Sequence, residues 1–166
     1  FLLLGFALLT LAGCQSAYYS AMEKVGLHKR DILVDRVEDA RDSQQEAKEQ
    51  FKDALERYRS VVQVKGGELE ERYEALNNEF EASENSAREV RDRIEAVEDV
   101  AEALFEEWKQ ELGEYSNASL KATSQRNLER TQKDYRVLLQ RMKAAEKRID
   151  PVLDVLRDQV LFLKHN

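Results

Sequence analysis

Apolar residues recur along most of the chain at alternating spacings of four and three, which places them in one stripe along an α-helix. Three such series follow one another, with interruptions near residues 65–67 and 113–117. The pattern therefore predicts three long helices, at about 29–64, 68–112 and 117–164. The series are Leu33, Val37, Ala40, Gln44, Ala47, Phe51, Ala54, Tyr58 and Val61; then Leu69, Tyr73, Leu76, Phe80, Ser83, Ala87, Val90, Ile94, Val97, Ala101, Leu104 and Trp108; then Ser124, Leu128, Thr131, Tyr135, Leu138, Met142, Ala145, Ile149, Val152 and Leu156.

The interruptions hold residues that end and restart helices. Gly66 and Gly67 each cost about 1 kcal/mol inside a helix, so we expect a turn there. Gly113 favours a second stop, and the Ser-Asn-Ala-Ser sequence at 116–119 supplies capping groups for the next helix. Three helices joined by short turns predict an all-α fold, namely an elongated antiparallel three-helix coiled-coil bundle over residues 29–166. The 3.5-residue period predicts a left-handed supercoil.

Small and polar residues at stripe positions indicate how the helices meet. Alanines allow two helices to approach closely, and large aromatic residues can fill the space opposite them. Polar residues such as Gln44, Ser124 and Thr131 can fix the register between helices at some cost in stability. The stripe alanines are Ala40, Ala47, Ala54, Ala87, Ala101 and Ala145.

Pro151 lies inside the third series and allows two arrangements. Asp150 can cap a restarted helix with Pro151 as its first residue, where the missing N–H costs nothing. Alternatively, the proline bends one continuous helix. Because the apolar stripe continues across it, we expect a third helix kinked near Pro151. The segment Val152–Leu163 is apolar on nearly all sides, so we expect the core or a partner to cover it.

The first residues differ from the rest of the chain. Phe1–Ala12 is almost purely apolar, and Leu-Ala-Gly-Cys closes the run at Cys14. This looks like the end of a bacterial lipoprotein signal peptide, truncated at its start because neither Met nor a basic region precedes it. The run is too short to span a bilayer, which needs about 20 apolar residues. The alternative is a short apolar tail beside a chance cysteine.

The signal-peptide resemblance implies a location. Residues 1–13 would be removed and Cys14, the only cysteine, would carry the lipid as the mature N-terminus. Residues 14–28 would form the lipidated end and a short membrane-proximal helix. Gln15 stands where an Asp usually retains such proteins at the inner membrane, so the resemblance favours the periplasmic face of the outer membrane over the inner membrane.

Two strings resemble a known family. Residues 18–31 read Tyr-Tyr-Ser-Ala-Met-Glu-Lys-Val-Gly-Leu-His-Lys-Arg-Asp, and residues 35–40 read Asp-Arg-Val-Glu-Asp-Ala. They are similar to a proteobacterial family of short lipoproteins classed as domain of unknown function 2959. The resemblance covers Cys14 to Asn166 and implies a helical coiled coil in the cell envelope. It implies no activity and no catalytic residue.

Composition and motifs argue against catalysis and against several partners. The net charge of −7 disfavours nucleic acid, and it also disfavours anionic headgroups, so a covalent anchor would be needed at a membrane. His28 and His165 lie in no metal-ligand spacing, and no phosphate-binding loop or nucleophile elbow is present. Carboxylates at helical spacing read as a solvated face. The sequence therefore predicts no enzyme activity, no metal, no cofactor and no small-molecule substrate.

Two functions fit these features. The first is a lipid-anchored periplasmic scaffold, spacer or adaptor that binds an envelope protein or associates with itself. The alternative is a chaperone-like, lipid-binding or peptide-binding module that uses the apolar C-terminal segment, with Leu161 and Phe162 as its binding residues.

Overall fold

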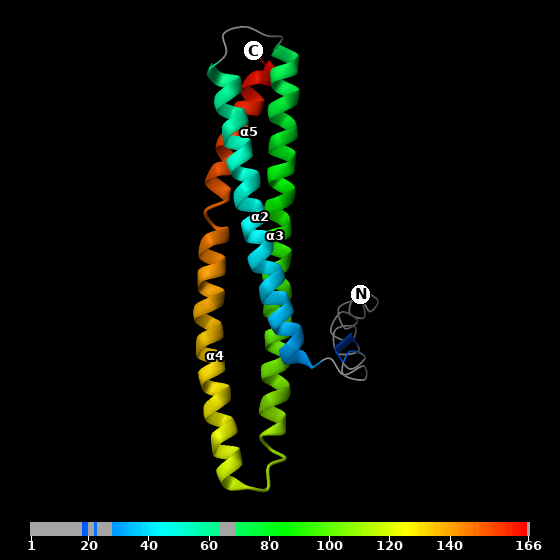
Figure 1. Cartoon of the computed structure of the whole chain (residues 1–166), viewed down its shortest axis with the longest axis vertical. Helices are drawn as coiled ribbons and strands as arrows, with labels where there is room; N and C mark the ends of the chain where they lie inside the picture. The colour runs from blue at the N-terminus through cyan, green and yellow to red at the C-terminus, as the bar shows by residue number, and fades with distance from the viewer. Residues whose placement is uncertain (1–17, 20–21, 23–27, 64–68, 166) are drawn as a thin grey trace, which may run out of the picture.

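The computed structural model describes residues 18–19, 22, 28–63 and 69–165, and all regular structure in these residues is helical. Its four long helices are α2 (Lys29–Gln63), α3 (Leu69–Glu111), α4 (Ala118–Glu146) and α5 (Asp150–His165), shown in Figure 1. The all-α class is thus confirmed for the described part of the chain, whereas the coiled-coil packing and its supercoil stay predictions.

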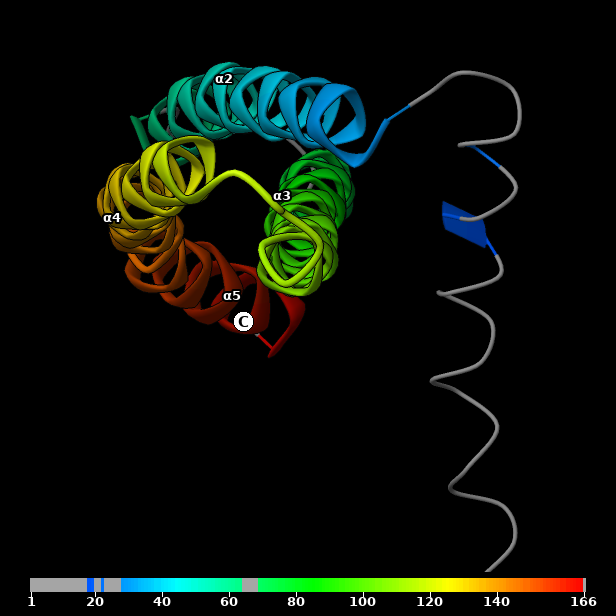
Figure 2. The same ribbon diagram turned by 90° about the horizontal axis from the view of Figure 1, so that it is seen from below.

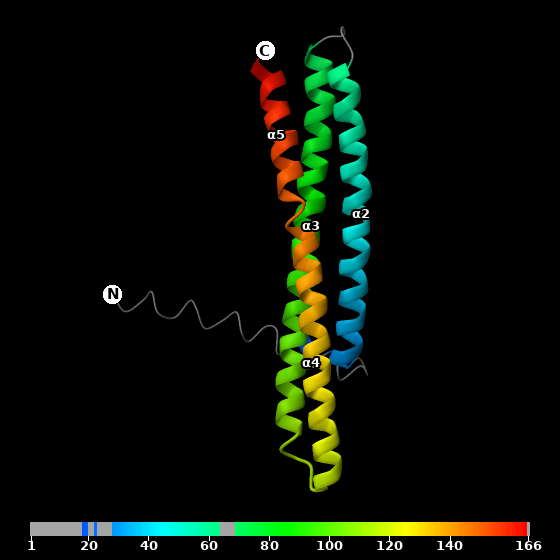
Figure 3. The same ribbon diagram turned by 90° about the vertical axis from the view of Figure 1, so that its left-hand side faces the viewer.

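The four helices form an elongated assembly whose long axis is vertical in Figure 1. α2 and α3 run antiparallel, α4 returns along α3, and α5 continues in the direction of α4 (Figure 3). The view along the long axis in Figure 2 shows α4 and α5 together taking the third position beside α2 and α3. α3 is the common partner, because α2, α4 and α5 all pack against it. At one end α3 and α4 continue past the start of α2 (Figure 1).

The expected kink at Pro151 is replaced by a break just before it. α4 ends at Glu146, residues 147–149 form a turn, and Asp150 starts α5. The proline ring disfavours a helical conformation in the residue before it and clashes with the carbonyl four residues back, so the chain interrupts the helix upstream. Pro151 then lies in the first turn of α5, where no N–H donor is needed.

Capping by Asn117 fixes the start of α4. Its side-chain Oδ1 accepts hydrogen bonds from the backbone N–H groups of Ser119 (2.9 Å) and Leu120 (3.1 Å). These are two of the donors that the first turn of a helix leaves without an internal partner. The capping role predicted for residues 116–119 is therefore confirmed at Asn117.

The core follows most of the predicted stripe residues of α2 and α3. Four of the six stripe alanines are fully buried, and they share the core with large side chains from all four helices. The third series departs from the pattern, because Leu138 is 38% exposed and Ala145 is exposed. Several residues outside the predicted stripes are buried as well, among them Ile32, Val100, Phe105 and Leu153. The main cluster contains Ala40, Ala47, Phe51, Ala87, Val90, Ile94, Val97, Met142 and Leu153.

Polar stripe residues link the helices as expected. The Gln44 side-chain amide of α2 donates to the Met142 carbonyl of α4 at 3.1 Å. The Trp108 indole N–H of α3 donates to the Ser124 hydroxyl of α4 at 2.8 Å. Each bond joins two different helices at one position along the stripe, so each opposes a shift in register.

Ser83 provides a test of the core. Its side chain is fully buried in α3, and its hydroxyl has no hydrogen-bond partner among the described residues. An unsatisfied buried hydroxyl is destabilising, so Ser83→Ala should raise the free energy of unfolding by about 1 kcal/mol. Urea denaturation followed by far-UV circular dichroism measures this change. Ser86→Ala on the same helix, where the side chain is only half-buried, is the matched control and should gain less. A loss of stability in Ser83→Ala would contradict the packing described here.

The N-terminal region contributes three described residues, Tyr18, Tyr19 and Met22, all helical. Tyr19 is buried against Ile32 of α2 and Val100 of α3, with Met22 beside them. The rest of the short helix expected within residues 14–28, and the predicted signal peptide, lie outside the described residues. In the described ranges, no helix has the combination of length and apolar character that a membrane span requires.

Candidate functional site

The two binding residues predicted from sequence both reach the surface of α5. Leu161 is 47% exposed and Phe162 is 58% exposed, whereas the opposite face of the helix is buried. The buried face consists of apolar residues of the segment Val152–Leu163, and it packs against α2 and α3 in the core. The core therefore covers only one side of the apolar segment. The residues on that side are Leu153, Leu156, Val160 and Leu163.

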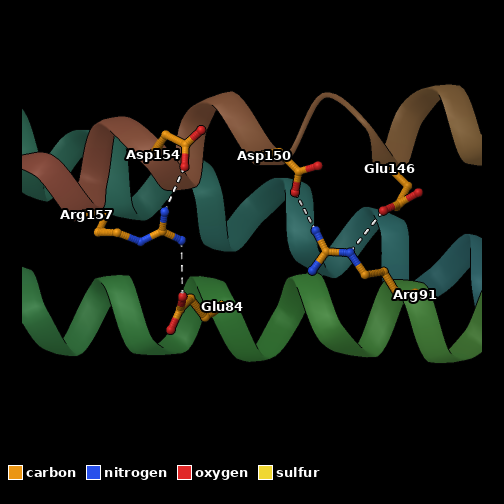
Figure 4. Close-up of polar contacts among 6 residues, drawn as sticks. All are labelled: Glu84, Arg91, Glu146, Asp150, Asp154 and Arg157. Carbon is orange, nitrogen blue, oxygen red and sulfur yellow. Dashed lines mark hydrogen bonds and ion pairs between the residues drawn. The ribbon is translucent and has the colours of Figure 1, made fainter.

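Two arginines hold the start of α5 against α3 (Figure 4). Arg91 of α3 bridges the end of α4 and the start of α5, with its Nε 3.0 Å from Glu146 Oε1 and an Nη2 contact to Asp150. Arg157 of α5 contacts Asp154 at 2.8 Å and Glu84 of α3 at 3.6 Å. These side chains are partly exposed, so each pair contributes at most about 1 kcal/mol. Their main effect is therefore to position the end of α4 and the start of α5 against α3, and they add little to the stability of the fold.

A groove of about 490 Å³ lies between the second half of α2 and the segment that joins α4 to α5. Its floor is apolar, with Phe51 and Leu55 on the α2 side and Ile149 and Val152 on the other side. The break at 147–149 shapes the second wall, because it sets where Ile149 and Val152 lie. The full lining is Lys48, Phe51, Lys52, Leu55, Glu56, Arg59, Arg148, Ile149 and Val152.

Cations line both edges of this groove. Lys48, Lys52 and Arg59 follow one another along α2, and Arg148 lies on the opposite wall. All four side chains are exposed, and none forms an ion pair with another described residue. Within the described lining, Glu56 is the one acidic side chain. The groove thus combines an apolar floor with an excess of positive charge.

Charge is unevenly divided between the helices, which the whole-chain value of −7 conceals. α3 has fifteen acidic and five basic side chains. Residues 118–148, which comprise α4 and the start of the following turn, have nine basic and three acidic side chains. The net charge of the whole chain therefore does not describe this segment, which is basic. A count of charges by predicted helix, instead of over the whole chain, would have found it.

Two tyrosines with raised pKa values lie in packed regions and not in the groove. Burial raises the pKa of Tyr135 to about 12, helped by the nearby carboxylates of Glu98 and Glu102, and its ring packs edge-on against Phe105. Burial also raises the pKa of Tyr19, with Asp99 adding to the effect. Both hydroxyls therefore stay protonated near neutral pH. In the described part of the chain, no group of three or more His, Cys, Asp or Glu side chains is placed to hold a metal ion.

The other residues singled out from sequence are not brought to the groove. His28 and His165 are both exposed, at the start of α2 and the end of α5. Cys14, the predicted lipidation site, lies outside the described residues. The groove itself was missed, because its two walls come from segments about 90 residues apart in sequence and no linear motif joins them. What its side chains offer is apolar contact and positive charge for a ligand.

Comparison with known proteins gives one match. A family model described as "Protein of unknown function (DUF2959)" matches residues 18–166. No curated protein and no solved structure matches the chain.

Proposed function

We propose a function for this chain, which belongs to the DUF2959 family of proteins of unknown function. It is a non-catalytic, lipid-anchored adaptor or scaffold at the periplasmic face of the outer membrane. The lipid is carried by Cys14, at the end of an apolar run typical of lipoprotein signal peptides. Gln15 supports the outer membrane over the inner membrane.

The observation that carries the proposal is the extended helical frame. α3 has 43 residues, so it is about 65 Å long at 1.5 Å per residue. Tyr19, which is close to the predicted anchor, packs with Val100 of α3. Phe51, at the base of the groove, belongs to the same cluster as Ala87 of α3. This separation corresponds to about 20 Å along α3. Such a frame holds a binding surface at a set distance from an anchored end, as an adaptor requires.

Anchoring is tested by the fate of Cys14. Cells producing the full chain or Cys14→Ala are fed an alkyne-bearing fatty acid, and their membranes are then separated. We expect the unmodified chain to be labelled and recovered with the outer membrane, and Cys14→Ala to be unlabelled and soluble. Gln15→Asp is the matched variant and should move the labelled chain to the inner membrane. Labelling that persists in Cys14→Ala would contradict this proposal.

The adaptor role is tested by photocrosslinking in cells. A photoreactive residue is placed at an exposed position on each of three helices: Val34, Val137 and Val155. We expect a discrete envelope protein at one or more positions, lost when Cys14→Ala removes the anchor. Recovery of the same proteins with an unrelated lipoprotein would exclude a specific adaptor. Crosslinks to copies of this chain alone would instead support a self-associating spacer.

A second candidate is a chaperone-like or lipid-binding module, which the exposure of Leu161 and Phe162 favours. Its test is binding of a hydrophobic fluorescent dye to the purified chain. Loss of dye fluorescence in Leu161→Ser with Phe162→Ser would support it, and Val34→Ser is the control on another helix. Absence of dye binding to the unmodified chain would exclude it.

A further inference from the structure

We propose that the groove between α2 and the α4–α5 junction binds an acidic amphipathic helix of a partner protein. This inference rests on the proposed adaptor function and specifies the chemistry of its partner. Two features of the groove carry it: the shape of its floor and the distribution of its charge.

The floor suits one face of a helix. Phe51 is 9% exposed and forms the base, while Leu55, Ile149 and Val152 are half-buried and leave apolar surface accessible. The α2 wall runs from Lys48 to Arg59, about 16 Å or three helical turns. A docked helix inserts side chains spaced by three and four residues into such a groove, so a wall of three turns accommodates a stripe of that kind.

The charge pattern separates a helix from a single-chain lipid. A fatty acid or lysolipid has its negative charge at one end, so it needs cations at one end of a groove. Here Lys48, Lys52 and Arg59 are spread along the whole α2 wall, and Arg148 faces them. Carboxylates repeated along the flanks of a helix match this spread, because each meets a cation without leaving another one uncompensated.

The acidic face of α3 in a second copy does not match the groove. The exposed side of α3 is acidic, but the larger apolar residues interspersed there, such as Ile94 and Val97, are buried in the core. That face could form ion pairs with the groove edge but could not fill the apolar floor. The α3 face of a second copy is therefore not the occupant. The exposed carboxylates on this face of α3 are Asp92, Glu95, Asp99, Glu102 and Glu106.

The test uses the full chain carrying Cys14→Ala, so that it does not depend on anchoring. The probe is a fluorescent helical peptide of about five turns, with leucines along one stripe and glutamates on both flanks; a second peptide has lysine in place of every glutamate. We expect the glutamate peptide to bind at least about tenfold more tightly than the lysine peptide, measured by fluorescence anisotropy. Added salt should weaken this binding.

A charge-reversed groove provides the decisive variant. Lys48→Glu, Lys52→Glu and Arg148→Glu together alter only exposed side chains and should weaken binding of the glutamate peptide at least about tenfold. The matched control reverses Arg126, Arg130 and Lys133, which are exposed on α4 away from the groove, and should retain binding. Equal loss in both variants, or equal binding of both peptides, would overturn the proposal. Displacement of the peptide by palmitate, or self-association lost only in the groove variant, would assign the groove to a lipid or to a second copy instead.

The result is separable from the anchor. If Cys14→Ala stays in the membrane but the peptide binds as expected, the proposed lipid anchor at Cys14 is wrong and the groove assignment stands. If the anchor is confirmed and the peptide does not bind, the chain remains a tethered scaffold and the helix-binding groove is wrong.

Discussion

Replacing Leu156 with alanine is expected to lower the free energy of unfolding by about 2–5 kcal/mol. Leu156 is fully buried in α5 and packs in a cluster with Leu76 of α3 and Ala54 of α2. Truncation removes favourable burial and leaves a cavity that three helices together enclose, so the structure can relax only in part. The measurement is urea denaturation followed by far-UV circular dichroism.

Val155→Ala is the matched control for this change. Val155 precedes Leu156 on the same helix but is 51% exposed, so its replacement should change stability by no more than about 0.5 kcal/mol. The difference between the two variants measures which face of α5 is buried. Equal losses would show that α5 does not pack as described, and that the wall of the groove formed by Val152 is not held in place.

The sequence determines α2 and α3 well because each keeps a strict stripe against the other. Their alanines are buried where the pattern puts them, since two antiparallel helices of similar length bury the same stripe along their shared extent. The pattern fails near the start of α2. There Val100 is buried with Tyr19 and with Ile32 of α2, and Phe105 is buried with Leu128 of α4. α3 continues past this end of α2 (Figure 1).

The candidate site was less accessible to sequence reasoning than the fold. Stripe periodicity identifies Phe51 and Val152 as apolar positions, but it assigns them to a closed core and not to the floor of a groove. The groove opens because the chain breaks at 147–149, and the pattern favoured a continuous bent helix there. Its cations looked like ordinary solvated residues, since their meeting across two helices depends on the tertiary arrangement.

The second large effect concerns the contact between α2 and α3: Ala87→Leu is expected to lower the free energy of unfolding by about 1–3 kcal/mol. Ala87 is fully buried in α3, in a cluster with Ala40 and Ala47 of α2. Small side chains on both helices indicate a close approach, and a leucine there would force the helices apart or adopt a strained rotamer. Thermal and urea denaturation of the full chain both measure the loss.

Ala145→Leu distinguishes the structure from the sequence pattern, because the pattern gives Ala87 and Ala145 the same role. In the structure Ala145 is exposed on α4, so leucine should change stability by no more than about 0.5 kcal/mol. Leucine also has a high helix propensity, so a loss of stability in this variant would not be caused by a weaker tendency to form a helix. A loss in Ala145→Leu as large as that in Ala87→Leu would mean that another helix covers this side of α4, as the sequence pattern predicts. A small change would mean that Ala145 lies on an uncovered side of α4, so that the apolar stripe of the third series does not form a closed seam along its whole length.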